Sequence, residues 1–326
     1  MPSTVRQFAK LNRLTYSEFL ERSDEFSASV SGMNEIASFC SGPIWGNAAH
    51  ESLHGTASES NSLIIESDGN WLVFVERQQP RVFLPLESGW LFGSPLIGDP
   101  DRLPELLLKA AHEFLPSPVG FCIGGVRAEG RLHRGLRARR EFCRQFKEFE
   151  ATDCMMIDLA DGFDAWLARR SRKFRRTMRN LPEIEVHDGS KLDEDEALER
   201  MMAIQRQTYK WESGEDIFQS GSHAAFYRSL LEKLQARGEL RLLFAQCENE
   251  DSGYIFGGVA GSVYRGFQMS YVEKFRDLGI GNSLQLENLR RQSDAGIVEY
   301  DLGMHSPYKE RWADRHDRYV AVFMVV

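Results

Sequence analysis

The sequence has few cysteines, no long apolar run and no excess of positive charge, and each absence argues against a class of protein. Its five cysteines are scattered and form no C-x-x-C pair, which is typical of buried thiols in a reducing compartment. No apolar run approaches the roughly 20 residues that span a bilayer. The net charge of -8 argues against generic nucleic-acid binding, which favours a basic domain.

The N-terminus also lacks the apolar core of a secretory signal, because Met1 to Arg6 leads into a polar stretch. We therefore expect a cytoplasmic protein without membrane insertion. At 326 residues the chain is long for one hydrophobic core, so we also expect two domains.

The most informative feature that is present is the stretch from Gly266 to Leu289. Apolar and polar residues alternate from Phe267 to Val272, which predicts a strand. A turn with Gly279 and Gly281 follows, and the leucines after it recur at helical spacing.

The start of that helix is a candidate anion site. A helix start leaves backbone N–H groups without intrahelical partners and carries the positive end of the helix dipole. Glycines there let a ligand approach the backbone closely. The stretch therefore predicts a cradle for a phosphate or diphosphate, with a tight turn that binds nothing as the alternative.

The spacing R-x-x-G-x-G, with Arg276, Gly279 and Gly281 in the motif positions, resembles the acyl-coenzyme A pyrophosphate loop of the GNAT N-acyltransferases. Further segments come in the order of one GNAT branch, the CelD/BcsL-like acetyltransferases, which are related to the FemABX peptidyltransferases. These segments are Tyr209-Lys210-Trp211, Phe226-Tyr227, Glu299 to Gly303 and Tyr308 to Trp312.

The resemblance implies an α+β protein of two tandem GNAT-like domains, each a mixed, mostly antiparallel sheet flanked by helices. Residues 1–152 would form a degenerate GNAT-like domain and residues 153–326 the acyltransferase domain. In the first, four apolar runs between Leu63 and Gly93 predict an antiparallel meander. In the second we expect one helix from Asp161 to Asn180, and a last strand from Tyr319 that closes the sheet.

The resemblance also implies which residues would bind acetyl-coenzyme A, or another acyl-coenzyme A, as the co-substrate. The backbone of the strand before the turn would hold the oxyanion, and the turn would bind the diphosphate. The expected residues are Met269, Ser270, Arg276, Leu278, Gly279, Ile280, Gly281, Asn282 and Ser283.

Three side chains are the catalytic candidates. Lys309 would stabilise charge on the carbonyl oxygen, as the matching lysine is thought to do in FemX-like relatives; otherwise it is a surface residue. Asp301 stands between apolar residues on a strand, so we expect it to pair with a cation, Lys309 included, or to act as the base. Tyr271 would donate a proton to the leaving sulfur, unless it is an ordinary strand aromatic.

We expect the acceptor at a loop between two helices, with Lys210, Trp211 and Glu212 as candidate contacts and Tyr308 next to Lys309. Trp211 alternatively anchors the core. The acceptor would be a small-molecule amine, a nucleotide sugar or a peptide. Amino-acid transfer from aminoacyl-tRNA, as in FemABX enzymes, is the alternative function.

The run from Arg169 to Arg179 is strongly basic. It is either a solvated helix face or a contact for a phosphate. That phosphate would belong to a nucleotide sugar, to the 3′ position of the cofactor or to a tRNA end, and the sequence does not choose among them.

The segment from His50 to His54 spells H-E-x-x-H, the zinc-binding pattern of many metallopeptidases. Gly55 follows directly and is expected to end the helix, and no third histidine follows at metzincin spacing. A zinc hydrolase that uses His50, Glu51 and His54 is therefore a further alternative, while the main prediction includes no metal.

Overall fold

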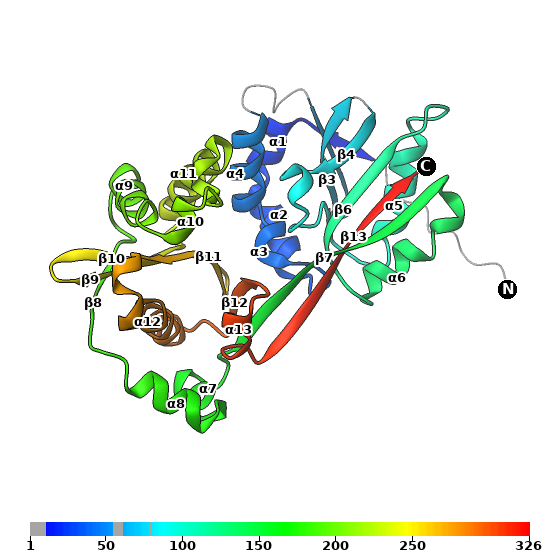
Figure 1. The fold of residues 1–326 in the computed structure, drawn as a ribbon. Helices are drawn as coiled ribbons and strands as arrows, with labels where there is room; N and C mark the ends of the chain where they lie inside the picture. Colours follow the sequence, from blue (N-terminus) through cyan, green and yellow to red (C-terminus); the bar gives the residue numbers. More distant parts are fainter. Residues whose placement is uncertain (1–10, 55–60, 79) are drawn as a thin grey trace. The chain divides into compact units, whose positions relative to one another are not determined.

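The structure is a computed structural model that describes residues 11–54, 61–78 and 80–326 (Figure 1). Its contacts divide the chain into two compact units: Met1–Thr152 together with Arg318–Val326, and Asp153–Asp317. The N-terminal residues in which we expect no signal segment, and Gly55, lie outside the described residues.

The first unit is built on a mostly antiparallel sheet. Strands β1 to β4 pair antiparallel in sequence order, β4 pairs parallel with β6, β6 pairs antiparallel with β13, and β5 pairs with β3. The strands are β1 (Asn12–Leu14), β2 (Ser62–Ser67), β3 (Asn70–Gln78), β4 (Arg81–Pro85), β5 (Leu96–Ile97), β6 (Gly120–Arg127) and β13 (Arg315–Val325). The helices are α1 (Tyr16–Glu21), α2 (Ser23–Ser31), α3 (Ser38–Ser41), α4 (Pro43–His54), α5 (Leu103–His112) and α6 (Arg131–Arg137), with short 3₁₀ turns η2 (Ser88–Trp90) and η3 (Arg140–Phe142).

The core of the first unit consists of apolar side chains from both its strands and its helices. Phe83 and Phe121 are fully buried and stack with ring centroids 5.2 Å apart, and Phe74 lies edge-on to Phe121 at 5.4 Å. Three strands of the predicted meander, β2, β3 and β4, are confirmed.

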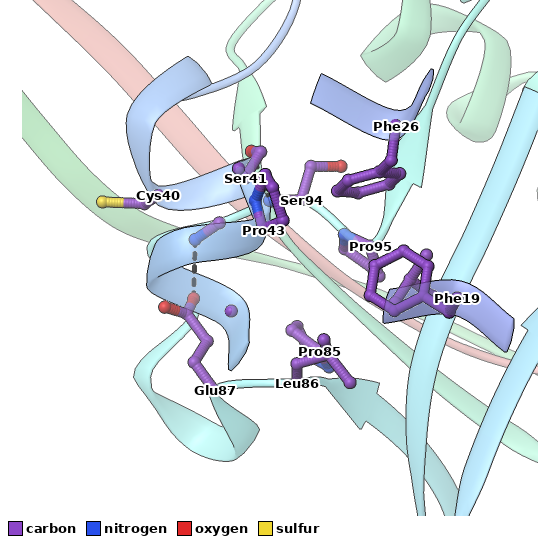
Figure 2. A pocket seen from close by; sticks show the side chains of 14 residues that line it. Phe19, Phe26, Cys40, Ser41, Pro43, Pro85, Leu86, Glu87, Ser94 and Pro95 are labelled. Atoms are coloured by element: carbon purple, nitrogen blue, oxygen red, sulfur yellow. Dashed lines mark hydrogen bonds between the residues drawn. The ribbon is translucent and has the colours of Figure 1, made fainter. Parts of the chain in front are cut away.

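The fourth predicted strand of the meander, Trp90 to Gly93, was wrong. The chain forms the turn η2 there, and Leu91 adopts a left-handed conformation with φ of 60°. The cause is Glu87, whose buried carboxylate accepts hydrogen bonds from Trp45 Nε1 and, at 2.6 Å, from Gly93 N (Figure 2). A carboxylate is left inside the protein only where donors converge on it, so the segment folds around Glu87 instead of pairing.

The second unit has a mixed sheet in the order β7, β12, β11, β10, β9, β8, in which only β12 and β11 are parallel. Helices α9, α10 and α11 cover one face, and α12 packs on the other (Figure 1). The strands are β7 (Gln145–Asp158), β8 (Glu185–Asp188), β9 (Leu240–Cys247), β10 (Glu250–Ala260), β11 (Val263–Tyr271) and β12 (Glu299–Met304). The helices are α7 (Phe163–Arg169), α8 (Arg172–Arg179), α9 (Glu194–Gln205), α10 (Tyr209–Glu212), α11 (Gly221–Ala236), α12 (Ile280–Asp294) and α13 (Pro307–Glu310), with 3₁₀ turns η4 (Ile217–Gln219) and η5 (Glu273–Leu278).

The helix predicted from Asp161 to Asn180 is two helices, α7 and α8. Arg170 is extended, and Ser171 caps α8 by accepting a hydrogen bond from Phe174 N at 3.1 Å. Arg170 donates to the carbonyl oxygens of Trp312 and Ala313 at 3.0 and 2.8 Å. These tertiary contacts and the serine cap break the helix where the sequence period alone predicts continuity.

The segment from Tyr319, which we expected to close the second sheet, pairs with β6 of the first unit. Val322 and Met324 are fully buried and belong to the core of that unit. The end of the chain is therefore part of the first unit. None of the helices in the described residues is both long and apolar enough to cross a membrane.

Candidate functional site

The sheet of the second unit splits between its two parallel strands. Residues Val263–Arg265 of β11 pair with Glu299–Asp301 of β12, and in the described part of the chain no later residue of β11 pairs with β12. Beyond this point β11 continues to Tyr271 against β10, while Met304 of β12 pairs with Cys154 of β7. The split leaves backbone groups of β11 open on one edge, which is the condition for binding an extended ligand there.

The turn predicted to hold a diphosphate lies at the end of β11. Gly279 has φ of 68°, a left-handed conformation that favours glycine, and it is the N-cap of α12. Asn282 N and Ser283 N hydrogen-bond back to Gly279 O at 2.9 and 3.1 Å. The amides of Ile280 and Gly281 precede the first intrahelical bond and are the donors that a helix start offers to an anion.

Side chains around this turn supply further polar groups. Arg276 is exposed, forms an ion pair with Glu273 at 2.8 Å and lies 5.9 Å from the ring centroid of Tyr209. The hydroxyl oxygen of Ser283 is buried and has no hydrogen-bond partner among the described residues. Because an unpartnered buried hydroxyl is costly, this atom in the first turn of α12 fits a site that an anionic ligand completes.

Tyr271 and Met269 project from β11 toward the start of α12. A Cβ atom placed on Gly281 would lie 3.4 Å from Met269 Cε and 3.5 Å from the ring of Tyr271. Ser270 is buried and lies on the opposite face, since side chains alternate along a strand. Tyr308 OH lies 3.4 Å from Gly281 O, and burial raises the pKa of Tyr308.

Lys309 lies at the split. Its Nζ donates to Met304 O at 3.0 Å and would lie 3.5 Å from a Cβ atom on Gly303, whose φ is 84°. Burial and the nearby charge of Arg265 lower the pKa of Lys309 to about 8, while Asp301 acts in the opposite direction. Lys309 is therefore an ammonium that titrates near neutral pH.

Asp301 pairs with a cation, as we expected, but the cation is Arg265 rather than Lys309. Arg265 is 6% exposed and also donates to Cys154 Sγ at 3.3 Å. The second oxygen of Asp301 accepts Gly303 N at 2.7 Å, so both carboxylate oxygens have partners. Burial and the charge of Asp301 raise the pKa of the Cys154 thiol to about 11, which leaves the sulfur protonated. These contacts favour a positioning role for Asp301 over that of a base.

The segment predicted to be an acceptor loop is the short helix α10, which Thr208 caps through a bond from Trp211 N at 3.3 Å. Lys210 and Glu212 are exposed, and Trp211 is half-buried. A hollow of about 190 Å³, here called the acceptor hollow, lies between α10 and β11. Its lining residues are Gln205, Tyr209, Lys210, Glu215, Asp216, Ile217 and Gln268.

The acceptor hollow lies near the split, because Gln268 of β11 lines it and Lys210 is close enough to Lys309 to lower its pKa. The structure thus brings Lys210 together with Lys309, Asp301 and the α12 turn. Trp211 and Glu212 do not line the hollow.

The H-E-x-x-H segment lies in the first unit on α4. His50 is fully buried, with its ring centroid 4.7 Å from that of Tyr16, and His54 Nε2 lies 3.0 Å from Ser88 Oγ. Burial lowers the pKa of His54. Across residues 11–54, 61–78 and 80–326 no group of three histidine, cysteine, aspartate or glutamate side chains is arranged to hold a metal ion.

The first unit also encloses a hollow of about 20 Å³ beside Phe19, Phe26 and Glu87 (Figure 2). This volume is enough for one water molecule and too small for a substrate.

Sequence reasoning missed Arg265, Gln268 and Arg311. Arg311 Nη2 donates to Asn282 Oδ1 at 2.8 Å, and so places a cation at the start of α12. Arg265 could have been found from the sequence, because an arginine in a strand that is expected to be buried requires a partner for its charge. Arg311 and Gln268 carried no such signal, because their roles depend on contacts between distant segments.

Comparison with known proteins identifies the class of domain in the second unit. Residues 167–310 match a protein-family model described as an acetyltransferase (GNAT) domain. The chain therefore contains a GNAT acetyltransferase domain, which confirms the resemblance to this superfamily, while the roles of Arg276, Gly279 and Gly281 stay predictions. No curated protein matches the chain.

Solved structures share its fold over nearly the whole chain. The crystal structure of FemX has 13% identity and a TM-score of 0.67, with 97% of each chain covered. A conserved protein of unknown function from Bacteroides thetaiotaomicron has 11% identity and a TM-score of 0.63, covering 98% of this chain and 100% of that one. L-PGS from Bacillus licheniformis has 15% identity and a TM-score of 0.54, covering 91% of this chain and 90% of that one. Identities this low establish the α+β fold alone.

Proposed function

We propose that the protein is a cytoplasmic N-acyltransferase that moves an acyl group, in the first instance acetyl, from acyl-coenzyme A to an amine by direct attack. The observation that carries the proposal is the split between β11 and β12, which leads from Lys309 to the first turn of α12. The acceptor amine would enter through the acceptor hollow. In this proposal the catalytic unit is Asp153–Asp317, and the first unit is a degenerate GNAT-like scaffold.

The reaction needs the thioester to be positioned and the developing oxyanion to be stabilised. The amides of Ile280 and Gly281, with Arg276, Asn282 and Ser283, would hold the diphosphate of the co-substrate. The open backbone edge of β11 at Met269–Tyr271 would align its thioester. These groups are held by the sheet and by α12, so they are pre-organised.

In the chemical step the amine nitrogen attacks the thioester carbonyl carbon, the C–N bond forms and the C–S bond breaks. The ammonium of Lys309 stabilises the negative charge that develops on the carbonyl oxygen. Tyr271 supplies a proton to the leaving sulfur, the amine gives up a proton to water, and that proton returns through water to the Tyr271 oxygen. The products are an amide and free coenzyme A. The ion pair of Arg265 with Asp301 lies beside Gly303, and Lys309 Nζ, which donates to Met304 O, would lie next to it.

A thermal-shift panel tests this proposal. Acetyl-coenzyme A and free coenzyme A at about 100 times a dissociation constant stabilise the folded protein by about 2.7 kcal/mol. Transfer to an amine panel is then followed by thiol release. A protein that none of these ligands stabilises, but that transfers an amino acid from aminoacyl-tRNA, has the FemABX-type activity and contradicts the proposal. Stoichiometric zinc that requires both His50 and His54 would instead favour a hydrolase.

A further inference from the structure

Helix α8 presents a row of cations that form no ion pair with any described residue of the chain. Phe174 and Met178 are its buried residues. Arg172, Arg176 and Arg179 recur on the opposite side at helical spacing, and all three are exposed. Within the described residues none of the three has a carboxylate within 4.0 Å.

The other arginines of this segment are used within the protein. Arg169 and Arg170 form ion pairs with Asp314, and Arg175 donates to the carbonyl oxygens of Ala168 and Arg170 at 2.7 and 2.8 Å. The basic run is thus divided into arginines that fix α7 and α8 in place and arginines that face outward. A cation in the last turn stabilises a helix dipole, but this does not explain a row along the exposed face.

The C-terminal end of α8 lies against the α12 turn. Leu181 follows the C-cap residue Asn180, and its Cδ2 would lie 3.0 Å from a Cβ atom on Gly279. Arg179 is two residues before Leu181, and Arg176 is one helical turn before Arg179. The end of α8 that carries Arg179 and, one turn earlier, Arg176 is therefore next to the place where a diphosphate would bind, and Arg172 lies at the far end of α8.

We propose that Arg176 and Arg179 bind the 3′-phosphate of coenzyme A. This inference rests on the proposed function. In coenzyme A the 3′-phosphate is one ribose away from the diphosphate, so a diphosphate at Ile280 and Gly281 brings this dianion close to the end of α8. Arginine side chains form charge-assisted hydrogen bonds to phosphate, which are stronger than neutral ones.

Titration calorimetry of the full-length protein with coenzyme A and with 3′-dephospho-coenzyme A tests the assignment. The unsubstituted protein binds coenzyme A about tenfold more tightly, a preference that shrinks at higher salt. The double variant R176Q/R179Q binds coenzyme A only as tightly as it binds the dephospho form. Its affinity for the dephospho form equals that of the unsubstituted protein. The matched control R172Q/K173Q removes two charges from the far end of α8 and keeps the preference. Circular dichroism shows whether each variant is folded.

Equal affinity of the unsubstituted protein for the two ligands would overturn the inference and leave the proposed function standing. Retention of the preference in R176Q/R179Q would do the same. If a single-stranded RNA probe binds, and both double variants weaken it while leaving the coenzyme A preference intact, α8 is a nucleic-acid contact and the inference is wrong. Failure of both coenzyme A forms to bind would contradict the proposed function itself.

Discussion

At the scale of single residues, the split between β11 and β12 contains two kinds of charge. Arg265 and Asp301 form a buried pair with further partners on both sides. Lys309 is half-buried, near both of them, and has no carboxylate of its own within 4.0 Å among the described residues. The ion pair links β11 to β12 at the split, and Lys309 is left to interact with a ligand.

Replacement of Lys309 by glutamine should lower kcat for acyl transfer about 100-fold with little change in KM for acetyl-coenzyme A, because the stabilised charge exists only in the transition state. Steady-state kinetics with the best amine acceptor measures this. Lys274→Gln, which removes an exposed lysine paired with Glu250, serves as the control and leaves kcat unchanged. An equal loss in both variants would remove Lys309 from the mechanism.

The pH dependence of kcat follows from the lowered pKa of Lys309. The groups that face this lysine are Arg265 on β11, Asp301 on β12, Cys154 on β7 and Lys210 on α10. Because the charged form is the active one, the contribution of Lys309 is full below pH 8 and is lost as the pH rises through about 8. Lys309→Arg stays charged, so its profile should lack this descending limb. A limb at the same pH in both proteins would assign it to another group.

The buried pair makes a separate prediction about stability. Asp301→Asn should lower the free energy of unfolding by about 3–5 kcal/mol, because it leaves the charge of Arg265 buried without a counterion. Glu273→Gln breaks the exposed ion pair with Arg276 and should change the free energy of unfolding by no more than about 0.5 kcal/mol. Urea denaturation of the two variants compares them directly. A similar small effect at both positions would mean that Asp301 is not buried with Arg265.

At the scale of elements, the strand, glycine turn and helix of β11, η5 and α12 were predicted correctly, because the signals for them are local. The alternation of apolar and polar residues, the two glycines and the helical spacing of the leucines all lie between Gly266 and Leu289. The break between α7 and α8 was missed, since it depends on Arg170 binding carbonyl groups far along the chain. The partner of Asp301 was missed because it follows from the parallel register of β11 and β12, which no local pattern fixes.

The α12 turn provides a prediction at this scale. Gly279→Ala should weaken acetyl-coenzyme A binding at least tenfold, because the left-handed φ disfavours alanine by about 1–2 kcal/mol and the added Cβ would press on Leu181. Gly296 is the matched control, since its φ of 82° imposes similar strain but nothing lies within 4 Å of an added Cβ. The Gly296→Ala variant should have a lower free energy of unfolding and an unchanged affinity for acetyl-coenzyme A. Equal affinity in the two variants would argue that the turn does not bind the ligand.

At the scale of the whole molecule, the sequence predicted the α+β fold but not the place of the last strand. The residues after Arg318 form a continuous apolar run, which fits a strand of either sheet, and the pairing with β6 assigns them to the first unit. Likewise, Trp90 to Gly93 has the composition of a strand, but Glu87 holds it in a turn. In both places contacts between distant segments decide the structure.

The position of β13 predicts that the end of the chain stabilises the first unit. Met324→Ala removes a fully buried side chain and should lower the free energy of unfolding by about 2–5 kcal/mol. Arg318→Ala, at an exposed position of the same segment, should have a much smaller effect. Chemical denaturation monitored at the tryptophans of the first unit measures both. A neutral Met324→Ala variant would contradict the assignment of this strand to the core.

The central claim is that the start of α12 binds the diphosphate of an acyl-coenzyme A. Hydrogen–deuterium exchange of the full-length protein, with and without saturating acetyl-coenzyme A, tests it most directly. The account predicts slower exchange in the peptide that covers Arg276 to Ser283, where the amides of Ile280 and Gly281 become hydrogen-bonded. Unchanged exchange in this peptide, with protection elsewhere or nowhere, would contradict the account.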